Sequence, residues 1–347
     1  MTEFKTPTAK RFKSRITDDP GLQTPIKIPP SPFLEKIGYG CGVHVFTLER
    51  SPKVGFARSP WAVKKRNRSV HDDKKYNERI LFEAEMLRKL DHPNIVGFRG
   101  FAEASNGDPC LVMEKLDKSL GDMIEESLET DIGQFSASDI LKVGFEIVKG
   151  LEYLHHTAHV LHGDMKSYNV LVSEDCKIVK LCDFGVSVPL TESLEIDTSK
   201  GDFTYVGTEC WSAPEIIHEE GPFTNKADVW AYGLIIWEMI ALSPPHIDTE
   251  DSMDESFFND SVSEVDSSCG KEKQVPDDGL DDSIFILKEL TRNKFGTRPP
   301  LPAIDLGKEY QKVLEIFYAC TTVDQRVRPS AKGLVKFFEK YVYNTSD

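Results

Sequence analysis

Two polar clusters, each placed directly after a short apolar run, are the feature that most constrains how this chain can fold. The first spans residues 162–169 and reads His-Gly-Asp-Met-Lys-Ser-Tyr-Asn, and the second, Asp-Phe-Gly at 183–185, starts fourteen residues after Asn169. Between them, the short β-type runs 170–172 and 178–181 predict a strand–turn–strand unit. Asp-Phe-Gly alone is common, but both clusters in this order are hard to obtain by chance.

The side chains of these clusters are of the types that phosphoryl transfer requires. A carboxylate must accept or orient the proton of the attacking hydroxyl, which suits Asp164. A cation must offset the charge that develops on the transferred group, which suits Lys166. Oxygen ligands must hold Mg²⁺ against the phosphates, which suits Asn169 and Asp183. The two clusters therefore form a candidate catalytic and metal-binding set.

A glycine-rich segment and a lysine-bearing run precede the clusters. Gly38, Gly40 and Gly42 fall in the segment 37–45, where a hairpin backbone can approach phosphate oxygens and donate its N–H groups. Lys64 ends the run Trp-Ala-Val-Lys and can reach the α- and β-phosphates, and Glu83 is its candidate ion-pair partner. Each feature alone is equally typical of an ordinary hairpin, an edge lysine or a solvated glutamate, so these assignments depend on the two clusters.

Hydrophobic patterning divides the chain into a β-rich part and a helical part. The first part predicts a small, mostly antiparallel sheet with one helix at 76–90, and its strands lie at 33–37, 43–48, 61–65, 95–101 and 110–113. After Glu114 the pattern predicts helices at 140–154, 227–242, 284–290, 310–320 and 331–343. Ser136 or Ser138 can cap the first of these helices.

The acidic residues are concentrated in one stretch. Residues 248–282 hold thirteen Asp or Glu and two Lys, so they carry a charge of −11 out of −15 for the whole chain. The remainder shows no basic stripe, which argues against a nucleic-acid-binding protein. No apolar run reaches eighteen residues and the N-terminus lacks an apolar signal core, so we expect neither a membrane span nor a secretory signal.

Cysteine usage indicates a reducing compartment. The seven cysteines are odd in number, scattered, and contain no Cys-x-x-Cys pair. This pattern argues against a zinc site or a disulfide framework. We therefore expect the protein in the cytoplasm, with the nucleus as an open alternative.

With these motifs, the chain resembles the eukaryotic protein kinases from about residue 32 to residue 343. Three further segments agree: Gly-Thr-Glu-Cys-Trp-Ser-Ala-Pro-Glu at 207–215, Asp-Val-Trp-Ala-Tyr-Gly at 228–233 and Arg-Pro-Ser at 328–330. The resemblance implies a two-lobed α+β fold. Residues 1–30 are rich in Pro, Thr, Lys and Arg and lack hydrophobic periodicity, which predicts a disordered regulatory tail before it. An N-lobe at 31–114 would hold the antiparallel sheet plus one helix, and a C-lobe at 115–343 would be mainly helical. It also implies ATP and Mg²⁺ as cofactors and proteins as substrates.

The resemblance assigns the remaining nucleotide-site residues by position. Met113 corresponds to the gatekeeper beside the adenine pocket, and the backbone of Glu114 and Leu116 would meet the adenine edge. The apolar side chains that would line the nucleotide are those of Ile37, Val45, Ala62 and Leu171. The last three would sandwich the base. Periodicity by itself shows only that these residues suit burial.

Two further pairings that the resemblance implies are structural. Asp228 would anchor the turn at His162, and Glu215 would form an ion pair with Arg328. Neither pairing follows from spacing along the chain.

The chain departs from the kinase pattern at two glycines. The third loop glycine usually comes three residues after the second, but Val43 stands there and Gly42 comes one position early. Gly163 replaces the arginine that usually precedes the catalytic aspartate and pairs with a phosphorylated activation loop. We therefore predict that phosphates on the loop hydroxyls are not a strict on-switch; these hydroxyls belong to Thr198, Ser199, Thr204 and Tyr205.

These two departures and the acidic insert narrow the resemblance to one family of protein kinases. The His-Gly-Asp loop, the insert before Phe-Gly-Thr-Arg-Pro-Pro at 295–300, and Ser-Pro-Trp-Ala-Val-Lys-Lys at 59–65 resemble the PDZ-binding kinases. This family, also called the T-LAK cell-originated protein kinases, is grouped with the MAP kinase kinases. A PDZ ligand needs a terminal hydrophobic side chain, and this sequence ends in Asp347, so we do not expect PDZ binding here.

The tail and the insert suggest regulation and partners. Thr6 and Thr24 each precede a proline, which with the resemblance predicts an upstream cyclin-dependent kinase and mitotic control. The blander alternative is that proline is simply common in tails and turns. The insert 248–282 suits a solvated loop, or else a docking surface for a basic partner such as a MAP kinase or a histone tail.

The sequence leaves two questions of function open. Lys166 favours serine and threonine substrates, while the resemblance keeps dual specificity open. A pseudokinase that uses the insert as a scaffold is the alternative to an enzyme. The displaced Gly42 argues weakly for the pseudokinase. The residues that argue against it are the intact Lys64, Glu83, Asp164, Asn169 and Asp183. Substrate identity and oligomeric state do not follow from the sequence.

Overall fold

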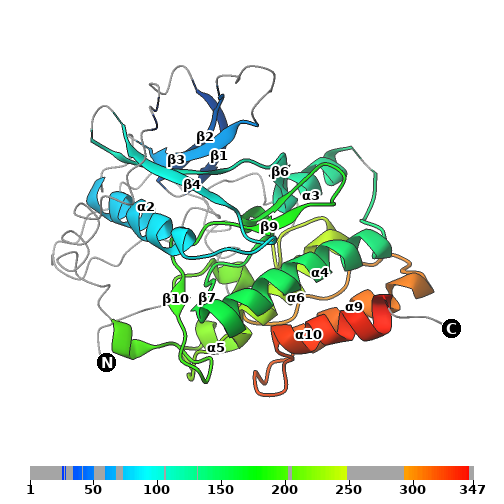
Figure 1. Cartoon of the computed structure of the whole chain (residues 1–347). Helices are drawn as coiled ribbons and strands as arrows, with labels where there is room; N and C mark the ends of the chain where they lie inside the picture. The colour runs from blue at the N-terminus through cyan, green and yellow to red at the C-terminus, as the bar shows by residue number, and fades with distance from the viewer. Residues whose placement is uncertain are drawn as a thin grey trace, which may run out of the picture.

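The computed structural model describes most of the two predicted lobes. The described residues are 26, 28, 34–40, 42–50, 59–67, 73–104, 107–130, 132–201, 205–247 and 293–343. Several predicted features lie outside them: Thr6 and Thr24, the acidic insert 248–282, and the helix at 284–290. Figure 1 shows a sheet with one helix packed above a larger group of helices. The predicted two-lobed α+β protein kinase fold is confirmed.

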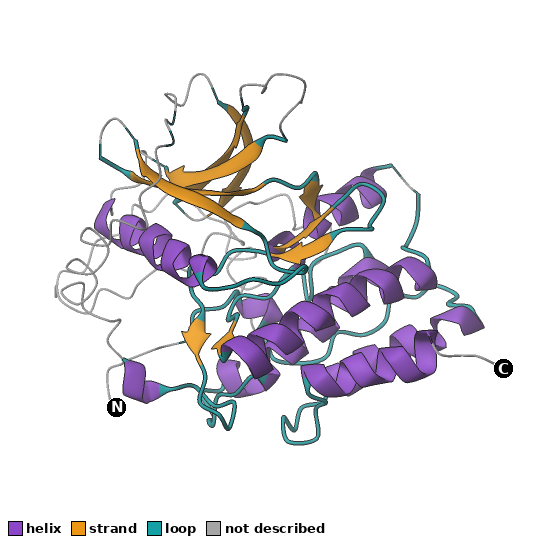
Figure 2. Ribbon diagram, viewed as in Figure 1, coloured by secondary structure: helices purple, strands orange, loops and turns teal. Residues whose placement is uncertain are grey.

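The N-lobe is a five-stranded antiparallel sheet of strand order β1-β2-β3-β5-β4 (Figure 2). Its strands are β1 (Glu35–Gly40), β2 (Val43–Leu48), β3 (Trp61–Arg66), β4 (Phe98–Glu103) and β5 (Pro109–Glu114). One helix, α2 (Asp73–Arg88), packs against β3, β4 and β5. Short strands, aromatic and β-branched residues and intervening turns account for the sheet.

The register of the central strands separates the two faces of this sheet. Val45 lies opposite Lys64, and Ala62 lies opposite Met113, so these four side chains share one face. That face belongs to the large hydrophobic core, which also contains residues of α2. The alternation of side chains along a strand therefore carries Lys64 toward the rest of the site.

The opposite face of the sheet is covered by residues from the segment that was expected to be a tail. Val63 and Val112 form a second apolar cluster on this face, and Ile26 and Ile28 pack against it. At these two positions the 1–30 segment contacts the sheet.

The predicted strand 95–101 is shorter in the structure, because its first residues pair elsewhere. β4 begins at Phe98, whereas Ile95 forms a parallel bridge with Leu181 in the C-lobe. The N–H of Val96 donates to the carbonyl oxygen of Leu181 at 2.9 Å. Backbone groups need partners wherever they are buried, and here the other lobe supplies them.

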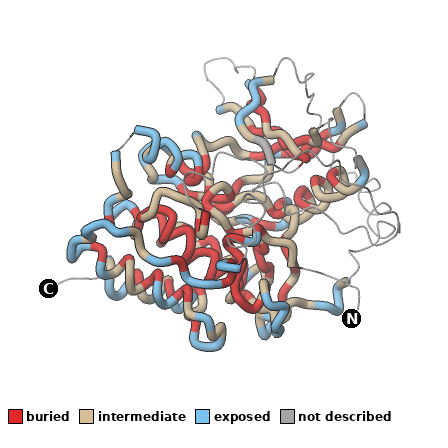
Figure 3. The backbone as a smooth tube through the Cα atoms, turned by 180° about the vertical axis from the view of Figure 1, so that it is seen from behind, coloured by how far each residue is buried: buried red, intermediate tan, exposed pale blue. Residues whose placement is uncertain are grey.

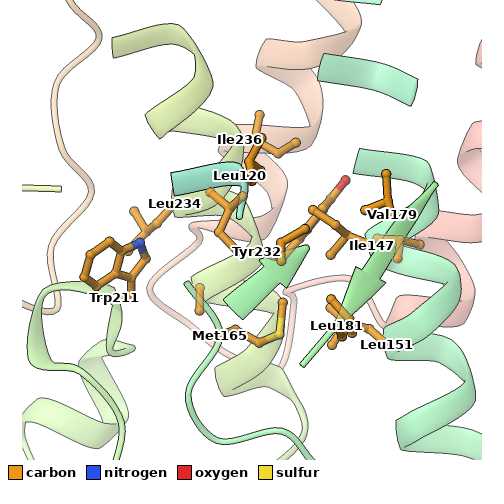
Figure 4. Packing of buried hydrophobic residues seen from close by; sticks show 14 of the residues in the cluster. Leu120, Ile147, Leu151, Met165, Val179, Leu181, Trp211, Tyr232, Leu234 and Ile236 are labelled. Atoms are coloured by element: carbon orange, nitrogen blue, oxygen red, sulfur yellow. The ribbon is translucent and has the colours of Figure 1, made fainter. Parts of the chain in front are cut away.

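The C-lobe is built around α6 (Lys226–Ala241), which is buried nearly all round (Figure 3). The other helices are α3 (Leu120–Glu129), α4 (Ala137–Tyr153), α5 (Pro214–Ile217), α9 (Gln311–Cys320) and α10 (Ala331–Phe338). Ser136, not Ser138, caps α4 and accepts a hydrogen bond from the N–H of Asp139. α4 and α9 pack against α6 and against each other, and α10 packs against α4. Figure 4 shows this core, where Tyr232 lies near Ile147 and Leu151 of α4.

Short strands and turns complete the lobe and carry the polar clusters. They are β6 (Lys118–Ser119), β7 (Val160–Leu161), β8 (Val170–Val172), β9 (Val179–Leu181) and β10 (Val188–Pro189). Turns of 3-10 helix cover Ser167–Asn169, Thr198–Lys200, Glu209–Trp211 and Lys308–Tyr310, and π-helical turns cover Leu154–Ala158 and Glu339–Tyr343. β8 and β9 form the predicted strand–turn–strand unit between the clusters. None of the described helices combines the length and hydrophobicity that crossing a membrane requires.

Candidate active site

Lys64 is at the centre of the first half of the site. Its Nζ lies 2.8 Å from Oε2 of Glu83 on α2 and 2.8 Å from Oδ1 of Asp183. Lys64 and Glu83 are buried, whereas the Asp183 side chain is 40% exposed. Three predicted residues from β3, α2 and the second polar cluster are therefore in direct contact.

The charged side chains of Lys64, Glu83 and Asp183 shift one another's pKa values. Burial acts to lower the pKa of Lys64, but the carboxylates of Asp183 and Glu83 outweigh it and raise that pKa above its usual value. Burial raises the pKa of Glu83 to about 7, in spite of the neighbouring ammonium group. Desolvation acts in the same way on Asp183, but Lys64 holds its pKa below the usual range. Lys64 is therefore a fixed cation, Asp183 a fixed anion, and Glu83 the member that can take up a proton near neutrality.

Asp164 lies at the centre of the second half, where Thr208 fixes one of its oxygens. Oδ1 accepts hydrogen bonds from the N–H of Thr208 at 3.0 Å and from its hydroxyl at 2.7 Å. Oδ2 lies 3.0 Å from Nζ of Lys166 and 3.0 Å from Nδ2 of Asn169. Lys166 also donates to the Thr208 hydroxyl at 2.8 Å. The carboxylate is thus held on both oxygens by charged and polar donors.

Electrostatics link the two halves. Burial acts to raise the pKa of Asp164, but Lys166 and the Thr208 hydrogen bond outweigh it and lower that pKa. Asp183 opposes this effect, and Lys166 in turn helps to lower the pKa of Asp183. Asn169 adds an amide contact with Asp164. The charged residues of the two halves are therefore coupled electrostatically: Lys64, Glu83, Asp164, Lys166 and Asp183.

The backbone before Asp164 is fixed by Asp228 at the start of α6. Its Oδ2 accepts from the N–H of His162 at 2.8 Å, and its Oδ1 accepts from the N–H of Gly163 at 3.0 Å. His155 adds a contact of 2.8 Å to the same carboxylate. Asp228 is fully buried, so each of its oxygens needs such partners. The structure thus contains the anchor that the kinase resemblance implied.

Asn169 and Asp183 provide an oxygen set that suits a hard cation. Nδ2 of Asn169 donates to the carbonyl oxygen of Asp164 at 2.7 Å, so its amide oxygen faces away from that bond. Asp183 is half-exposed and has a left-handed backbone, with φ of 63°. Among the described residues, no group of three or more His, Cys, Asp or Glu could hold a metal by itself. Two oxygen ligands agree with Mg²⁺, which usually binds one or two side chains and completes its shell with phosphates and water.

The residues assigned to the adenine pocket cluster at the end of β5. Met113 is buried, and Leu116 is half-buried. Glu114 uses its side chain elsewhere: its carboxylate accepts from the N–H of Gly97 at 3.0 Å and lies 3.3 Å from Nζ of Lys180. Its own N–H donates to the carbonyl oxygen of Gly97 at 2.8 Å. Glu114 can therefore meet a nucleotide only through its carbonyl oxygen.

The other assigned contacts come from both lobes. Ala62 is buried, and Val45 and Leu171 pack against the same large core. Ile37 on β1 is 41% exposed. A bound base would thus contact apolar side chains from both lobes, of which Ile37 is the most exposed.

Packing and backbone conformation explain why a glycine occupies position 42, one position earlier than in the kinase pattern. Gly42 forms the β1–β2 turn with φ of 72°, and a Cβ there would lie 2.2 Å from ring atoms of Tyr76 on α2. Its carbonyl oxygen accepts from the N–H of Asn67 at 2.8 Å. Gly42 therefore meets both a conformational and a steric requirement, whereas a Cβ at Gly38 would make only an ordinary contact with Val45.

Sequence reasoning missed two residues of the site. Thr208 was recognised only as part of the 207–215 motif, yet it holds Asp164 and Lys166. Glu238 on α6 accepts from the hydroxyl of Ser167 at 2.7 Å and from Nε1 of Trp211 at 2.7 Å, so it joins the first polar cluster to the 207–215 segment. A glutamate within an apolar helix was the available signal, because a buried carboxyl needs a partner.

Comparison with known proteins agrees with this geometry. The protein kinase domain family matches residues 33–338. The human lymphokine-activated killer T-cell-originated protein kinase is 40% identical over 344 residues, which cover 98% of each chain, so the predicted subfamily is confirmed.

Two further relatives match about half of this chain and a smaller share of their own length. The mitogen-activated protein kinase kinase kinase zak-1 of Caenorhabditis elegans is 35% identical over 173 residues, 48% of this chain and 22% of the relative. The serine/threonine-protein kinase pakG of Dictyostelium discoideum is 38% identical over 173 residues, 49% of this chain and 14% of the relative. This chain therefore belongs to the protein kinase domain family and is a protein serine/threonine kinase.

Proposed function

We propose that the enzyme transfers the γ-phosphoryl group of ATP, with Mg²⁺, to serine or threonine hydroxyls of protein substrates. The observation that carries this proposal is the double contact of Lys64, which pairs with both Glu83 and Asp183 at 2.8 Å. A lysine held between an α2 carboxylate and the second polar cluster is preorganised to receive phosphate oxygens. Preorganised charge is usually the largest contribution to catalysis of this kind.

The roles of the other residues follow from their contacts. Lys166 would offset charge on the transferred group, and Asp164 would orient the attacking hydroxyl. Because the pKa of Asp164 is lowered, its carboxylate is a weak base and would accept the proton late in the transfer. Thr208 would keep both side chains in place through its hydroxyl.

The nucleotide would lie between the sheet and the C-lobe strands. Gly38, Gly40 and Gly42 would present backbone N–H groups to the phosphates, and Asn169 and Asp183 would hold the cation. Bound Mg²⁺ would neutralise phosphate charge during transfer. The base would contact Ile37, Val45, Ala62 and Leu171 beside Met113, with Glu114 and Leu116 offering backbone groups to its edge.

An ATP γ-phosphate transfer assay on a panel of proteins and peptides tests this function. We expect Asp164→Asn to lower kcat by at least about a hundredfold, because the hydroxyl loses its orienting carboxylate. Nucleotide binding should stay within about threefold of wild type, since Asn preserves the shape of the side chain. Equal transfer by both proteins would refute the assignment of Asp164.

The same assay decides between an enzyme and a pseudokinase scaffold. The ion pairs of Lys64 support the enzyme, because a scaffold has no need of a fixed phosphate-binding charge. A wild-type protein that binds ATP but transfers nothing to any substrate would favour the scaffold. Phosphotyrosine in the products would establish dual specificity, as in a MAP kinase kinase.

We also propose that the enzyme takes part in mitosis and MAP kinase signalling. It would act in the cytoplasm, with the nucleus as an alternative location. The support is the Thr-Pro pairs at Thr6 and Thr24, which suit a cyclin-dependent kinase, and the resemblance to the subfamily. Phosphopeptide mapping of mitotic cells should find one or both sites modified. Finding neither would remove the proposed mitotic control.

The acidic insert 248–282 is proposed to dock a basic partner, a MAP kinase or a histone tail. Its charge of −11 would attract such a partner. Deletion of the insert should raise the KM for a basic protein substrate without changing kcat for a short peptide. Unchanged substrate preference after deletion would mean that the insert is only a solvated loop.

A further inference from the structure

Gly163 is a position where a side chain does not fit. Its φ is 81°, and a Cβ there would lie 3.0 Å from the carbonyl oxygen of Val186. The positive φ makes any other residue strained, in addition to the close contact. The arginine that usually anchors a phosphorylated activation loop from this position is therefore replaced by a residue that presents only its backbone.

Tyr205 occupies space next to this backbone. A Cβ at Gly207 would lie 2.5 Å from Cε1 of Tyr205, 2.8 Å from its hydroxyl oxygen and 2.9 Å from the carbonyl oxygen of Gly163. The ring of Tyr205 and the carbonyl group of Gly163 thus both lie against Gly207. Because no positive φ is involved at Gly207, the requirement for glycine here comes from the ring and the carbonyl group.

The ring is also part of the hydrophobic packing of the C-lobe. It contacts the small apolar cluster of Leu161, Val188 and Leu190 and also packs against the large core. Burial raises the pKa of the Tyr205 phenol well above its usual value, the carboxylates of Asp228 and Asp164 add to this effect, and a hydrogen bond with Ser212 opposes it. The hydroxyl is therefore neutral, and a phosphate on it would be placed among carboxylates.

Tyr205 precedes Thr208 by three residues, and Thr208 holds the catalytic carboxylate. Both the N–H and the hydroxyl of Thr208 donate to Asp164, while Lys166 donates to Thr208. A displacement of about 1 Å at such contacts can lower a rate about a hundredfold. The position of Thr208 therefore contributes to the orientation of Asp164, together with Lys166 and Asn169 on the other oxygen.

We propose that Tyr205 is a positioning residue whose ring, held beside Gly163 and Gly207, fixes Thr208 on Asp164 without an activation-loop phosphate. This inference rests on the proposed phosphoryl transfer. It deepens the prediction that loop phosphates are not a strict on-switch, because it names the group that replaces the phosphate anchor. On this proposal, Tyr205 holds the segment in place and is not a phosphorylation site.

Steady-state kinetics of the full chain test the proposal, with Tyr205→Ala and Tyr205→Phe compared after phosphatase treatment. We expect Tyr205→Ala to lower kcat at least about tenfold, with the Kd for a non-hydrolysable ATP analogue within about threefold of wild type. Tyr205→Phe keeps the ring, so its kcat should stay within about threefold of wild type. A purely structural role would not give this separation of kcat from nucleotide binding.

A second pair of variants probes the same contact from its other side. Gly207→Ala should displace the ring and lower kcat as Tyr205→Ala does. Gly333→Ala is the matched control, because a Cβ at that exposed helical glycine would meet nothing closer than the Ser330 hydroxyl oxygen at 3.4 Å. Its kcat should equal that of wild type.

Three results would overturn the proposal. They are a loss smaller than tenfold in Tyr205→Ala, an equal loss in Tyr205→Phe, and a rate of the Thr6→Ala/Thr24→Ala protein that phosphatase treatment lowers more than about threefold. Should Tyr205→Ala fail to fold, Tyr205→Leu takes its place with the same expected loss, because it keeps an apolar side chain without the ring. The phosphatase treatment of the Thr6→Ala/Thr24→Ala protein then tests the proposal independently. A wild type without transfer activity refutes the proposed function, whereas an active wild type matched by Tyr205→Ala refutes only the role of Tyr205.

Discussion

Two buried ion pairs, one in each lobe, join residues far apart in the sequence but differ in how completely they are fixed. In the C-lobe, Arg328 contacts Glu215 through both terminal nitrogens, at 2.8 and 3.0 Å. Its three remaining N–H groups donate to the carbonyl oxygens of Thr322, Lys226 and Val323. All five donors of the guanidinium group thus have protein partners.

In the N-lobe, Lys64 divides one ammonium group between two carboxylates. Glu83 is buried, but Asp183 is 40% exposed, and burial raises the pKa of Glu83 to about 7. An ammonium group is a point charge without fixed geometry, so these contacts can be exchanged for phosphate oxygens. The pair of Arg328 and Glu215, in which every guanidinium donor is bonded, therefore stabilises the fold. The contacts of Lys64, which are shared between two carboxylates, are suited to binding.

The largest stability loss should come from the C-lobe pair. Glu215→Ala leaves Arg328 buried without its carboxylate, so we expect the free energy of unfolding to fall by about 3–5 kcal/mol. Denaturant unfolding measures this change. Glu315→Ala is the control, because it removes a half-exposed pair with Lys312 and should change stability by less than about 1 kcal/mol. Equal losses in the two variants would contradict the structural role of the buried pair.

Breaking the N-lobe pair should affect activity more than stability. We expect Lys64→Met to lower kcat/KM at least about a hundredfold, because the phosphates lose their fixed cation. The free energy of unfolding should fall by less than about 2 kcal/mol, since Glu83 can take up a proton and become neutral. Kinetics and denaturant unfolding of the same protein test both parts. A stability loss as large as that of Glu215→Ala would remove the distinction between the two pairs.

The smallest effect should come from Glu238, a buried carboxyl without a cationic hydrogen-bond partner. Burial raises its pKa to about 8, against hydrogen bonds from Ser167 and Trp211. Its contribution to stability is therefore complete below the ordinary carboxyl pKa and is lost as the pH rises through about 8. The Tm of the wild type should therefore fall between pH 6 and pH 9. In Glu238→Gln this fall should be smaller by about 2 °C, which corresponds to about 1 kcal/mol.

Thermal melts of wild type and Glu238→Gln at several pH values measure this difference. Glu83 titrates in both proteins, so the difference between them reports Glu238 alone. Identical pH profiles would show that Glu238 is ionised at neutral pH.

Much of the fold and of the site could be predicted from the sequence because the signals are local. The helix predicted at 76–90 corresponds to α2, and the one at 227–242 corresponds to α6. Burial of an apolar stripe or face decides such elements, and the periodicity of the residues records it. The polar clusters were recognisable because their residue types and order match one chemistry.

The remainder depends on contacts between distant segments. Thr208 reaches Asp164 across 44 positions, and Glu238 reaches Ser167 across 71. Ile95 leaves the predicted strand because Leu181 of the other lobe supplies its partner. No periodicity within a window of a dozen residues contains such information.

The sequence by itself determined the two polar clusters, the order of the motifs and the family, because these depend on residue types at short spacing. Only the tertiary structure decided which groups hold the first cluster in place: Asp228 on its backbone and Thr208 on the carboxylate of Asp164. The physical reason is that a charge or a buried polar group must be satisfied by whatever the fold brings near it. Which group that is depends on the packing of the whole chain.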